Sequence, residues 1–86
     1  MTYTVVITEY AIRQLKKLPP QVVARLKEAI AALADEPRPF NYIKLTNLEA
    51  YCIRVGSYRV IYEIHDTILT VVVVDVSDRK KSYKKR

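Results

Sequence analysis

The dipeptide Gly56-Ser57 separates two runs in which apolar and polar residues alternate, and each run carries one arginine, Arg54 or Arg59. A glycine at the first of two loop positions favours a type II′ turn, so the sequence predicts a tight β-hairpin. A two-residue loop fixes the register and places Arg54 directly opposite Arg59. Like charges at that spacing, about 4.5–5.5 Å between Cβ atoms, destabilise a hairpin unless an anion lies between them. Because guanidinium groups bind phosphate with a fixed planar geometry, the pair predicts a phosphodiester-binding site.

The predicted hairpin has two different faces. Arg54 and Arg59 share one face with three further residues: Cys52, Ile61 and Glu63. The other face is apolar and consists of Tyr51, Ile53, Val55, Tyr58, Val60, Tyr62 and Ile64. Since the apolar face is expected to pack on helices, the arginines should point outward. The alternative is that both arginines are solvated or paired with Glu63 and Asp75.

The net charge of +6 is concentrated at the C-terminus. Residues 1–78 contain nine basic and nine acidic side chains, which sum to zero. The excess comes from the tail, which contains Arg79, Lys80, Lys81, Lys84, Lys85 and Arg86. A basic tail on a neutral body favours binding to a polyanion such as nucleic acid, with a merely solubilising tail as the alternative.

Arg79 and Tyr83 follow the last long apolar run, and both could reach the same anion if that strand ends beside the hairpin. The basic residues around Tyr83 would favour its phenolate and make it a better proton acceptor near neutral pH. Tyr83 could equally stack on a base or hold the tail against the body of the protein. The sequence leaves these three roles open.

Other catalytic constellations are not evident in the sequence. His65 is the only histidine and stands beside Asp66 at a predicted turn, which favours a surface residue over a catalytic base. Cys52 has no second cysteine or neighbouring histidine, which favours a small sheet residue over a zinc ligand or nucleophile. No metal-ligand cluster, glycine-rich phosphate loop or nucleophile elbow is found, and no cofactor is expected. Any chemistry would then depend on arginine, lysine and tyrosine.

The elements that must position these residues follow from periodicity and capping. Residues 2–8 are rich in β-branched and aromatic side chains and predict a first strand. Thr8 can cap a short helix that ends before Pro19-Pro20, and Pro20 suits the first turn of a second helix that Pro37 terminates. The second helix has one apolar stripe, formed by Val22, Leu26, Ala29, Ile30 and Leu33.

The second half of the chain predicts the sheet. Residues 38–50 contain turn formers around the short segment 43–45, and the central hairpin follows. Residues 68–76 are almost continuously apolar, which predicts a strand covered on both faces in the middle of the sheet. The expected fold is α+β, with two N-terminal helices packed on a small antiparallel sheet in the order β-α-α-β-β-β(-β).

The chain length of 86 residues allows one small domain, spanning residues 1–86 with a basic tail at 79–86. The single cysteine gives no intrachain disulfide, and neither a signal peptide nor a membrane-spanning apolar run is evident. These features predict a cytoplasmic protein without a membrane partner.

The hairpin residues Arg54-Val55-Gly56-Ser57-Tyr58-Arg59-Val60-Ile61-Tyr62, with Lys44-Leu45 before them and Asp78-Arg79-Lys80-Lys81-Ser82-Tyr83 after them, resemble the RelE/ParE superfamily of bacterial toxins. The resemblance covers essentially the whole chain and implies a RelE-like two-layer fold. RelE-like members cut mRNA in the ribosomal decoding site, whereas ParE-like members inhibit DNA gyrase.

Four positions favour the RelE-like branch. Arg54, Arg59, Arg79 and Tyr83 match the basic residues and the C-terminal tyrosine of RelE-like ribonucleases, a set that ParE-like members usually lack. The resemblance therefore implies the toxin of a type II toxin–antitoxin system, a ribosome-dependent mRNA endonuclease that inhibits translation. A ParE-like gyrase inhibitor and a non-catalytic RNA-binding module are the alternatives.

The sequence departs from the RelE-like pattern at two positions. Cys52 stands where many relatives carry a second basic residue, which removes one charge from the expected site. Asp78 precedes Arg79 where histidine or lysine is common. Both departures concern how strongly the site would act on RNA.

The resemblance implies cleavage by the 2′-hydroxyl of the message, without metal or cofactor, giving a 2′,3′-cyclic phosphate and a 5′-hydroxyl end. Tyr83 would activate the nucleophile or hold a base, while Arg54, Arg59 and Arg79 would stabilise the pentacoordinate phosphorus. The resemblance does not identify the general acid that protonates the leaving 5′-oxygen. The implied partners are a small acidic antitoxin and the ribosome with its mRNA. RNA and ribosome contacts are expected from Lys44, Lys80, Lys81, Lys84, Lys85 and Arg86.

Overall fold

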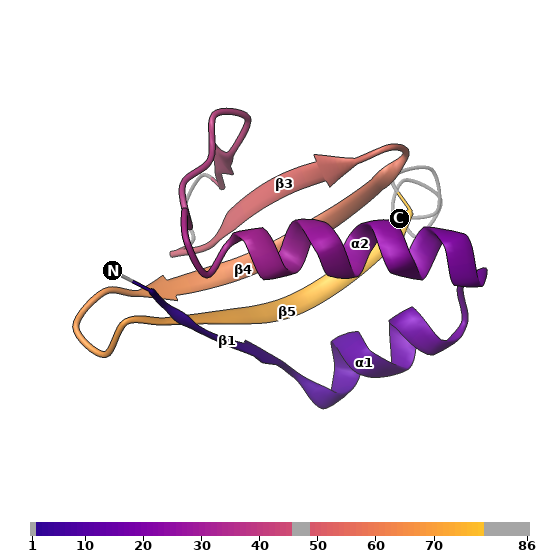
Figure 1. The fold of residues 1–86 in the computed structure, drawn as a ribbon, viewed down its shortest axis with the longest axis horizontal. Coiled ribbons are helices and arrows are strands. Elements are labelled where there is room, and N and C mark those ends of the chain that lie inside the picture. Colours follow the sequence, from indigo (N-terminus) through magenta and orange to yellow (C-terminus); the bar gives the residue numbers. More distant parts are fainter. Residues whose placement is uncertain (1, 46–48, 79–86) are drawn as a thin grey trace.

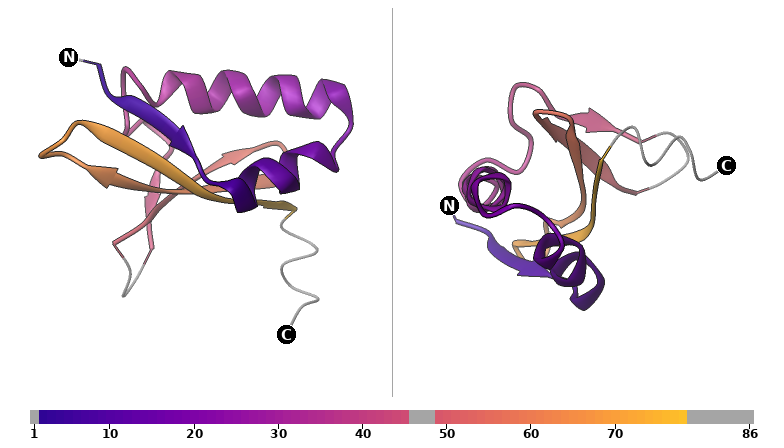
Figure 2. Two further views of the ribbon diagram at one scale, coloured as in Figure 1. Left: turned by 90° about the horizontal axis from the view of Figure 1, so that it is seen from below. Right: turned by 90° about the vertical axis from the view of Figure 1, so that its right-hand side faces the viewer.

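The computed structural model describes residues 2–45 and 49–78. Its elements are β1 (Thr4–Ile7), α1 (Glu9–Lys16), α2 (Pro20–Ala32), β2 (Ile43–Lys44), β3 (Tyr51–Val55), β4 (Tyr58–His65) and β5 (Thr70–Asp78). The strands form one sheet in the order β1-β5-β4-β3-β2, and both helices lie on one face of it (Figure 1, Figure 2). The predicted two-layer α+β fold is therefore confirmed.

The sheet is mixed rather than wholly antiparallel. β1 runs parallel to β5, with Thr4 opposite Thr70 and Ile7 opposite Val73, while the other neighbouring strands are antiparallel. Tight turns join β3 to β4 and β4 to β5 and force those pairs to be antiparallel. β1 has no such link to β5, so its direction is free to differ. β5 lies between β1 and β4, as predicted for the long apolar run.

Local signals set where the helices begin and end. Thr8 Oγ1 accepts a hydrogen bond from the backbone N–H of Ala11 at 3.2 Å, as expected for an N-cap, and Pro20 is the first residue of α2. α2 ends at Ala32 rather than near Pro37. The reason lies in the last turn, where the backbone N–H of Leu33 donates to the carbonyl of Ile30, only three residues back.

The strands are shorter at their N-terminal ends than the sequence indicates. β1 begins at Thr4, and β5 begins at Thr70 rather than at residue 68. Leu69 has a φ of 47°, in the left-handed region, and its N–H donates to the Asp66 carbonyl at 3.2 Å. These two features make residues 66–69 a turn, so Ile68 and Leu69 do not belong to the strand.

The hydrophobic core forms between the helical layer and one face of the sheet. Its buried members are Ala11, Leu15, Leu26, Ile30, Leu33, Ile53, Val60, Tyr62, Val71, Val73 and Val76. The predicted apolar face of the hairpin contributes Ile53, Val60 and Tyr62 to this core. The buried Tyr62 hydroxyl donates a hydrogen bond of 2.7 Å to the Pro37 carbonyl, which joins β4 to the segment after α2.

A β-bulge in β5 turns Asp75 away from the core. Ile61 pairs with Asp75, but the next residue, Tyr62, pairs with Val73, so Val74 is the extra residue. In an unbroken strand, residue 75 would share the buried face with Val71 and Val73. The bulge moves Asp75 to the other face, which we call the outer face because the helices lie opposite to it. Among the described residues only the inner face is covered by helices, so the expected cover on both faces of β5 is wrong.

Candidate functional site

The β3–β4 hairpin has the predicted register. Arg54 lies opposite Arg59, and Val55 lies opposite Tyr58. Gly56 has a φ of 63°, whereas Ser57 is not among the residues with positive φ. Positive φ at the first loop position alone is the pattern of a type II′ turn. The turn therefore fixes two arginines side by side on the outer face.

The two arginines lack a described counter-ion. Arg54 is exposed and Arg59 is half-buried, and neither forms an ion pair within residues 2–45 and 49–78. The Nε atom of Arg59 is buried and has no hydrogen-bond partner in this part of the chain. A buried donor without an acceptor costs free energy, and a charged donor costs more than a neutral one. An anion bound between the arginines would remove both this cost and their mutual repulsion.

The two carboxylates that the sequence offered as partners are engaged elsewhere. Glu63 Oε1 lies 2.9 Å from His65 Nε2. Asp75 Oδ1 accepts a hydrogen bond of 3.0 Å from Gln14 Nε2, and Asp75 Oδ2 accepts one of 3.0 Å from Ser77 Oγ. Pairing of the arginines with Glu63 and Asp75, the alternative raised from the sequence, is thus not formed in the structure.

The last strand ends beside the hairpin. Ser77 lies opposite Arg59, and Asp78 lies opposite Tyr58, the first residue after the turn. The end of the described chain at Asp78 therefore lies beside the hairpin. The remaining candidate residues lie outside the described part of the chain: Arg79, Lys80, Lys81, Tyr83, Lys84, Lys85 and Arg86.

Lys44 does not share the face of the arginine pair. It is exposed on the edge strand β2, where it lies opposite Tyr51. Tyr51 packs against the core on the helix side, with its ring 6.0 Å from that of Tyr62. Because directly opposed residues point to the same face, Lys44 belongs to the helix side, and the sheet separates it from Arg54 and Arg59.

Arg25 is a basic residue beside the β3–β4 turn that could not be recognised as a site residue from the sequence. A Cβ placed on Gly56 would stand 3.8 Å from Arg25 Nη2 and 3.9 Å from Nη1, so the guanidinium of this α2 residue lies against the hairpin turn. Arg25 is exposed. Its position on a polar helix face gave no signal, since the contact depends on how α2 crosses the sheet.

Cys52 is buried on the outer face, near the arginine pair. Its relative exposure is 2%, in agreement with the predicted packing role. Burial raises the pKa of the Cys52 thiol, while the positive charges of Arg59 and Arg54 act in the opposite direction. A buried thiol with a raised pKa is a poor nucleophile at neutral pH.

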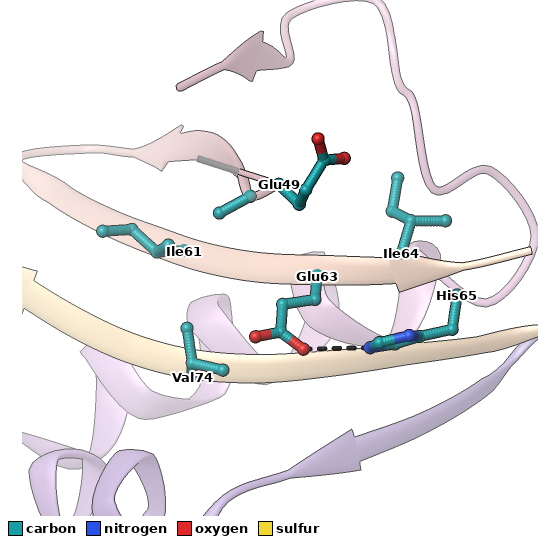
Figure 3. A pocket seen from close by; sticks show the side chains of 7 residues that line it. Glu49, Ile61, Glu63, Ile64, His65 and Val74 are labelled. Carbon is teal, nitrogen blue, oxygen red and sulfur yellow. Dashed lines mark hydrogen bonds and ion pairs between the residues drawn. The ribbon is translucent and has the colours of Figure 1, made fainter. Parts of the chain in front are cut away.

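A pocket on the outer face lies at the opposite end of β4 from the hairpin turn (Figure 3). Glu49, Glu63 and His65 supply its polar groups, and Ile61, Ile64 and Val74 line it with apolar atoms. His65 is exposed, as predicted, and its only described partner is Glu63. With two carboxylates and no arginine, this pocket repels phosphate and is distinct from the arginine pair.

Residues 2–45 and 49–78 contain no group of three or more His, Cys, Asp or Glu side chains that could hold a metal ion. In the same residues, neither helix is long and apolar enough to cross a membrane.

Solved structures of similar shape define the class of protein. The RelBE2 toxin–antitoxin complex of Mycobacterium tuberculosis matches with a TM-score of 0.82 and 36% identity, over 92% of this chain and 100% of the other. The archaeal RelE–RelB complex of Pyrococcus horikoshii matches with a TM-score of 0.82 and 32% identity, over 92% of this chain and 97% of the other. The fold is therefore that of a RelE-like toxin.

Sequence comparison gives the family. A family model described as the ParE toxin of the type II toxin–antitoxin system parDE matches residues 5–83. The toxin RelG of M. tuberculosis is 37% identical over 99% of this chain and 100% of its own length. The chain belongs to the RelE/ParE family of type II toxin–antitoxin toxins, as the resemblance of its hairpin implied.

Proposed function

We propose that this toxin is a ribosome-dependent endoribonuclease that acts in the cytoplasm and binds the scissile phosphate of mRNA between Arg54 and Arg59. The observation that carries the proposal is the arginine pair itself. It is held opposite across a tight turn, it has no ion-pair partner among the described residues, and one buried Nε atom lacks an acceptor. RNA phosphate supplies the missing acceptor.

The proposed reaction is a transesterification. The 2′-oxygen attacks the adjacent phosphorus and loses its proton to Tyr83. The P–O5′ bond breaks, and the 5′-oxygen takes up a proton from a general acid that we do not assign to a residue. The products are a 2′,3′-cyclic phosphate and a 5′-hydroxyl end. Arg54, Arg59 and Arg79 would stabilise the extra negative charge of the pentacoordinate state, an effect worth about 10²–10³-fold in rate for one donor.

Dependence on the ribosome has a physical reason. Arginine and tyrosine form a weak acid–base set near neutral pH, so much of the rate acceleration must come from holding the 2′-hydroxyl in line with the leaving oxygen. The decoding site would supply that alignment. The tail residues Lys80, Lys81, Lys84, Lys85 and Arg86 would contact ribosomal RNA, and Lys44 would need a separate contact on the helix side.

We also propose a cognate antitoxin, a small acidic protein, as a partner. The M. tuberculosis and P. horikoshii structures that this chain resembles are toxin–antitoxin complexes. Acidic side chains of an antitoxin would complement the unpaired arginines and prevent RNA from binding there.

The decisive experiment incubates the purified full-length toxin with mRNA-programmed ribosomes and maps the RNA ends. We expect cuts with 2′,3′-cyclic phosphate ends, which disappear when antitoxin is added. Tyr83→Phe should largely abolish cutting, because it removes the proton acceptor but keeps the ring. Intact mRNA with the wild-type toxin would overturn the proposal, and full activity of Tyr83→Phe would overturn the role of Tyr83.

Gyrase inhibition is the second candidate, because the matching family model carries the ParE name. A supercoiling assay with the same protein preparation distinguishes the two functions. Blocked supercoiling together with intact mRNA would assign the chain to the ParE-like activity. We expect unchanged supercoiling.

A further inference from the structure

Gln14 on α1 forms hydrogen bonds to the part of β5 that extends past the end of β1. β1 ends at Ile7, so the N–H of Val76 has no neighbouring strand on that side. The Gln14 side-chain amide takes the place of a strand. Its Oε1 accepts a hydrogen bond of 2.7 Å from Val76 N, and its Nε2 donates one of 3.0 Å to Asp75 Oδ1.

Asp75 shares a face of the sheet with Arg59 and is placed to neutralise its charge. The bulge brings Asp75 to the outer face, opposite Ile61 and therefore diagonal to Arg59 on the same face. Diagonal neighbours in an antiparallel pair remain within reach of long side chains. Cys52, which lies opposite Ile61 on the other side, is within the electrostatic influence of all three groups: Arg59 and Arg54 lower the pKa of its thiol, and Asp75 raises it.

The Asp75 carboxylate nevertheless points to other donors. One oxygen is bound by Gln14 and the other by the Ser77 hydroxyl. No ion pair joins Asp75 to Arg59 in residues 2–45 and 49–78. The Gln14 amide and the Ser77 hydroxyl, both neutral, thus occupy the two oxygens of Asp75. The Arg59 guanidinium is left able to bind a different anion.

We infer that Gln14 is a positioning residue that holds the Asp75 carboxylate away from Arg59 and so keeps Arg59 available to an RNA phosphate. The inference deepens the proposed function and rests on it for the identity of the anion. Without the Gln14 amide, Asp75 Oδ1 loses its donor, and the carboxylate can turn toward the Arg59 guanidinium, whose residue lies diagonal to it on the same face. The resulting ion pair competes with phosphate for the same nitrogen atoms.

The experiment follows the Arg59 Nε–H resonance by NMR in the full-length protein during titration with a 2′-O-methylated RNA tetranucleotide, which cannot be cleaved. Gln14→Leu keeps the size of the side chain but removes both amide groups. Asp75→Asn removes the competing charge. Gln21→Leu, at an exposed position of α2, is the matched control.

We expect Gln14→Leu to weaken RNA binding at Arg59 about tenfold, a typical effect of one hydrogen bond to a charged group. The double variant Gln14→Leu/Asp75→Asn should bind within about twofold of wild type, because the competing carboxylate is gone. The melting temperature should fall in both variants, since Val76 N loses its acceptor in both. Gln21→Leu should change neither quantity.

Recovery of RNA binding without recovery of the melting temperature separates positioning from a merely structural role. Equal binding by wild type and Gln14→Leu would overturn the inference, as would a double variant that stays as weak as Gln14→Leu. Absence of any RNA response at Arg59 in the wild type would also overturn it. RNA binding at Arg59 without mRNA cleavage on ribosomes would instead refute the proposed nuclease and leave the inference standing.

Discussion

The two ends of the sheet hold their charges in opposite ways. At the β4–β5 turn, Asp66 accepts hydrogen bonds from the Tyr3 hydroxyl at 2.6 Å and from Arg38 Nη2 at 3.0 Å, and Arg38 also lies 5.5 Å from the centre of the Tyr51 ring. At the β3–β4 turn, Arg54 and Arg59 lie opposite each other without a described ion-pair partner. Figure 1 shows these two turns at opposite ends of the sheet.

The difference separates charges that stabilise the fold from charges kept for a ligand. Tyr3, Arg38 and Asp66 come from three distant segments, so their interactions tie the first strand, the loop after α2 and the β4–β5 turn together. Arg54 and Arg59 come from one hairpin and gain no described carboxylate in return for their repulsion. Sites that break local rules of stability in this way are characteristic of function.

We call the β3–β4 turn with Arg54 and Arg59 the unpaired end of the sheet, and the β4–β5 turn with the ion pair of Arg38 and Asp66 the paired end. The largest expected effect is at the unpaired end. Arg54→Ala should reduce the rate of mRNA cleavage on programmed ribosomes by about 10²–10³-fold, since it removes one donor to the transition-state charge. The melting temperature should stay the same or rise, because the substitution relieves like-charge repulsion across the hairpin. Cleavage kinetics and calorimetry on the same preparation measure both quantities.

Arg13→Ala is the matched control for this substitution. Arg13 is an exposed arginine of α1 whose ion pair with Glu9 is long, at 3.9 Å. We expect unchanged cleavage and an unchanged melting temperature. A loss of stability in Arg54→Ala comparable to its loss of activity would show that the hairpin arginines are structural, and the contrast between the two ends would be lost.

The next largest effect is at the paired end, where stability should respond and activity should not. Tyr62→Phe removes the hydroxyl that donates to the Pro37 carbonyl and leaves a buried acceptor unsatisfied. A cost of about 1–3 kcal/mol is expected, with about 4–8 °C lost in melting temperature for each kcal/mol. Cleavage measured well below the melting temperature should equal that of wild type.

Tyr58→Phe offers a comparison at the other end of β4, since Tyr58 is only partly buried and packs beside the core. No described hydrogen bond involves its hydroxyl, so its melting temperature should stay within a degree or so of wild type, as for most substitutions away from buried polar contacts. Equal destabilisation of the two variants would mean that the Pro37 contact contributes nothing specific.

Features encoded by neighbouring residues could be predicted from the sequence. The type II′ turn, the register of Arg54 and Arg59 and the Thr8 cap each depend on a few adjacent positions, and the structure has all three. The apolar stripe of α2 could be predicted because helical periodicity repeats the same face. These local rules are sufficient to place the arginine pair on the outer face.

Features that depend on contacts between distant segments could not be predicted. The parallel pairing of β1 with β5 joins residues more than 60 positions apart, and so does the bond from Gln14 to Asp75. The bulge at Val74 is hidden because valine suits either face of a strand, and the shift of Asp75 becomes visible only from its partner on β4. The missed contributions of Gln14 and Arg25 both follow from this dependence on packing.

A smaller effect is expected at Arg25, whose guanidinium lies against Gly56. If RNA passes over the hairpin turn, Arg25→Ala should reduce the slope of log affinity against log salt by about 0.7, the value for one phosphate contact of a single strand. Lys27→Ala, an exposed cation on the same helix, is the control and should leave the slope unchanged. An identical slope for Arg25→Ala and wild type would confine the RNA site to the outer face.

The smallest effect concerns the acid stability of the paired end. The Arg38 guanidinium, and to a lesser extent the Tyr3 hydroxyl, hold the pKa of the Asp66 carboxyl below its ordinary value of about 3.9. A folded-state pKa below the unfolded one gives stability that is present above pH 4 and is lost as the pH falls through the folded pKa. Unfolding free energies of wild type and Asp66→Asn should therefore differ at neutral pH and converge in strong acid.

This difference in unfolding free energy should be small, because the Asp66 side chain is exposed and solvent screens its ion pair with Arg38. A gap that persisted unchanged to the lowest pH would show that Asp66 acts through packing, and the paired end would then owe its stability to shape rather than to charge.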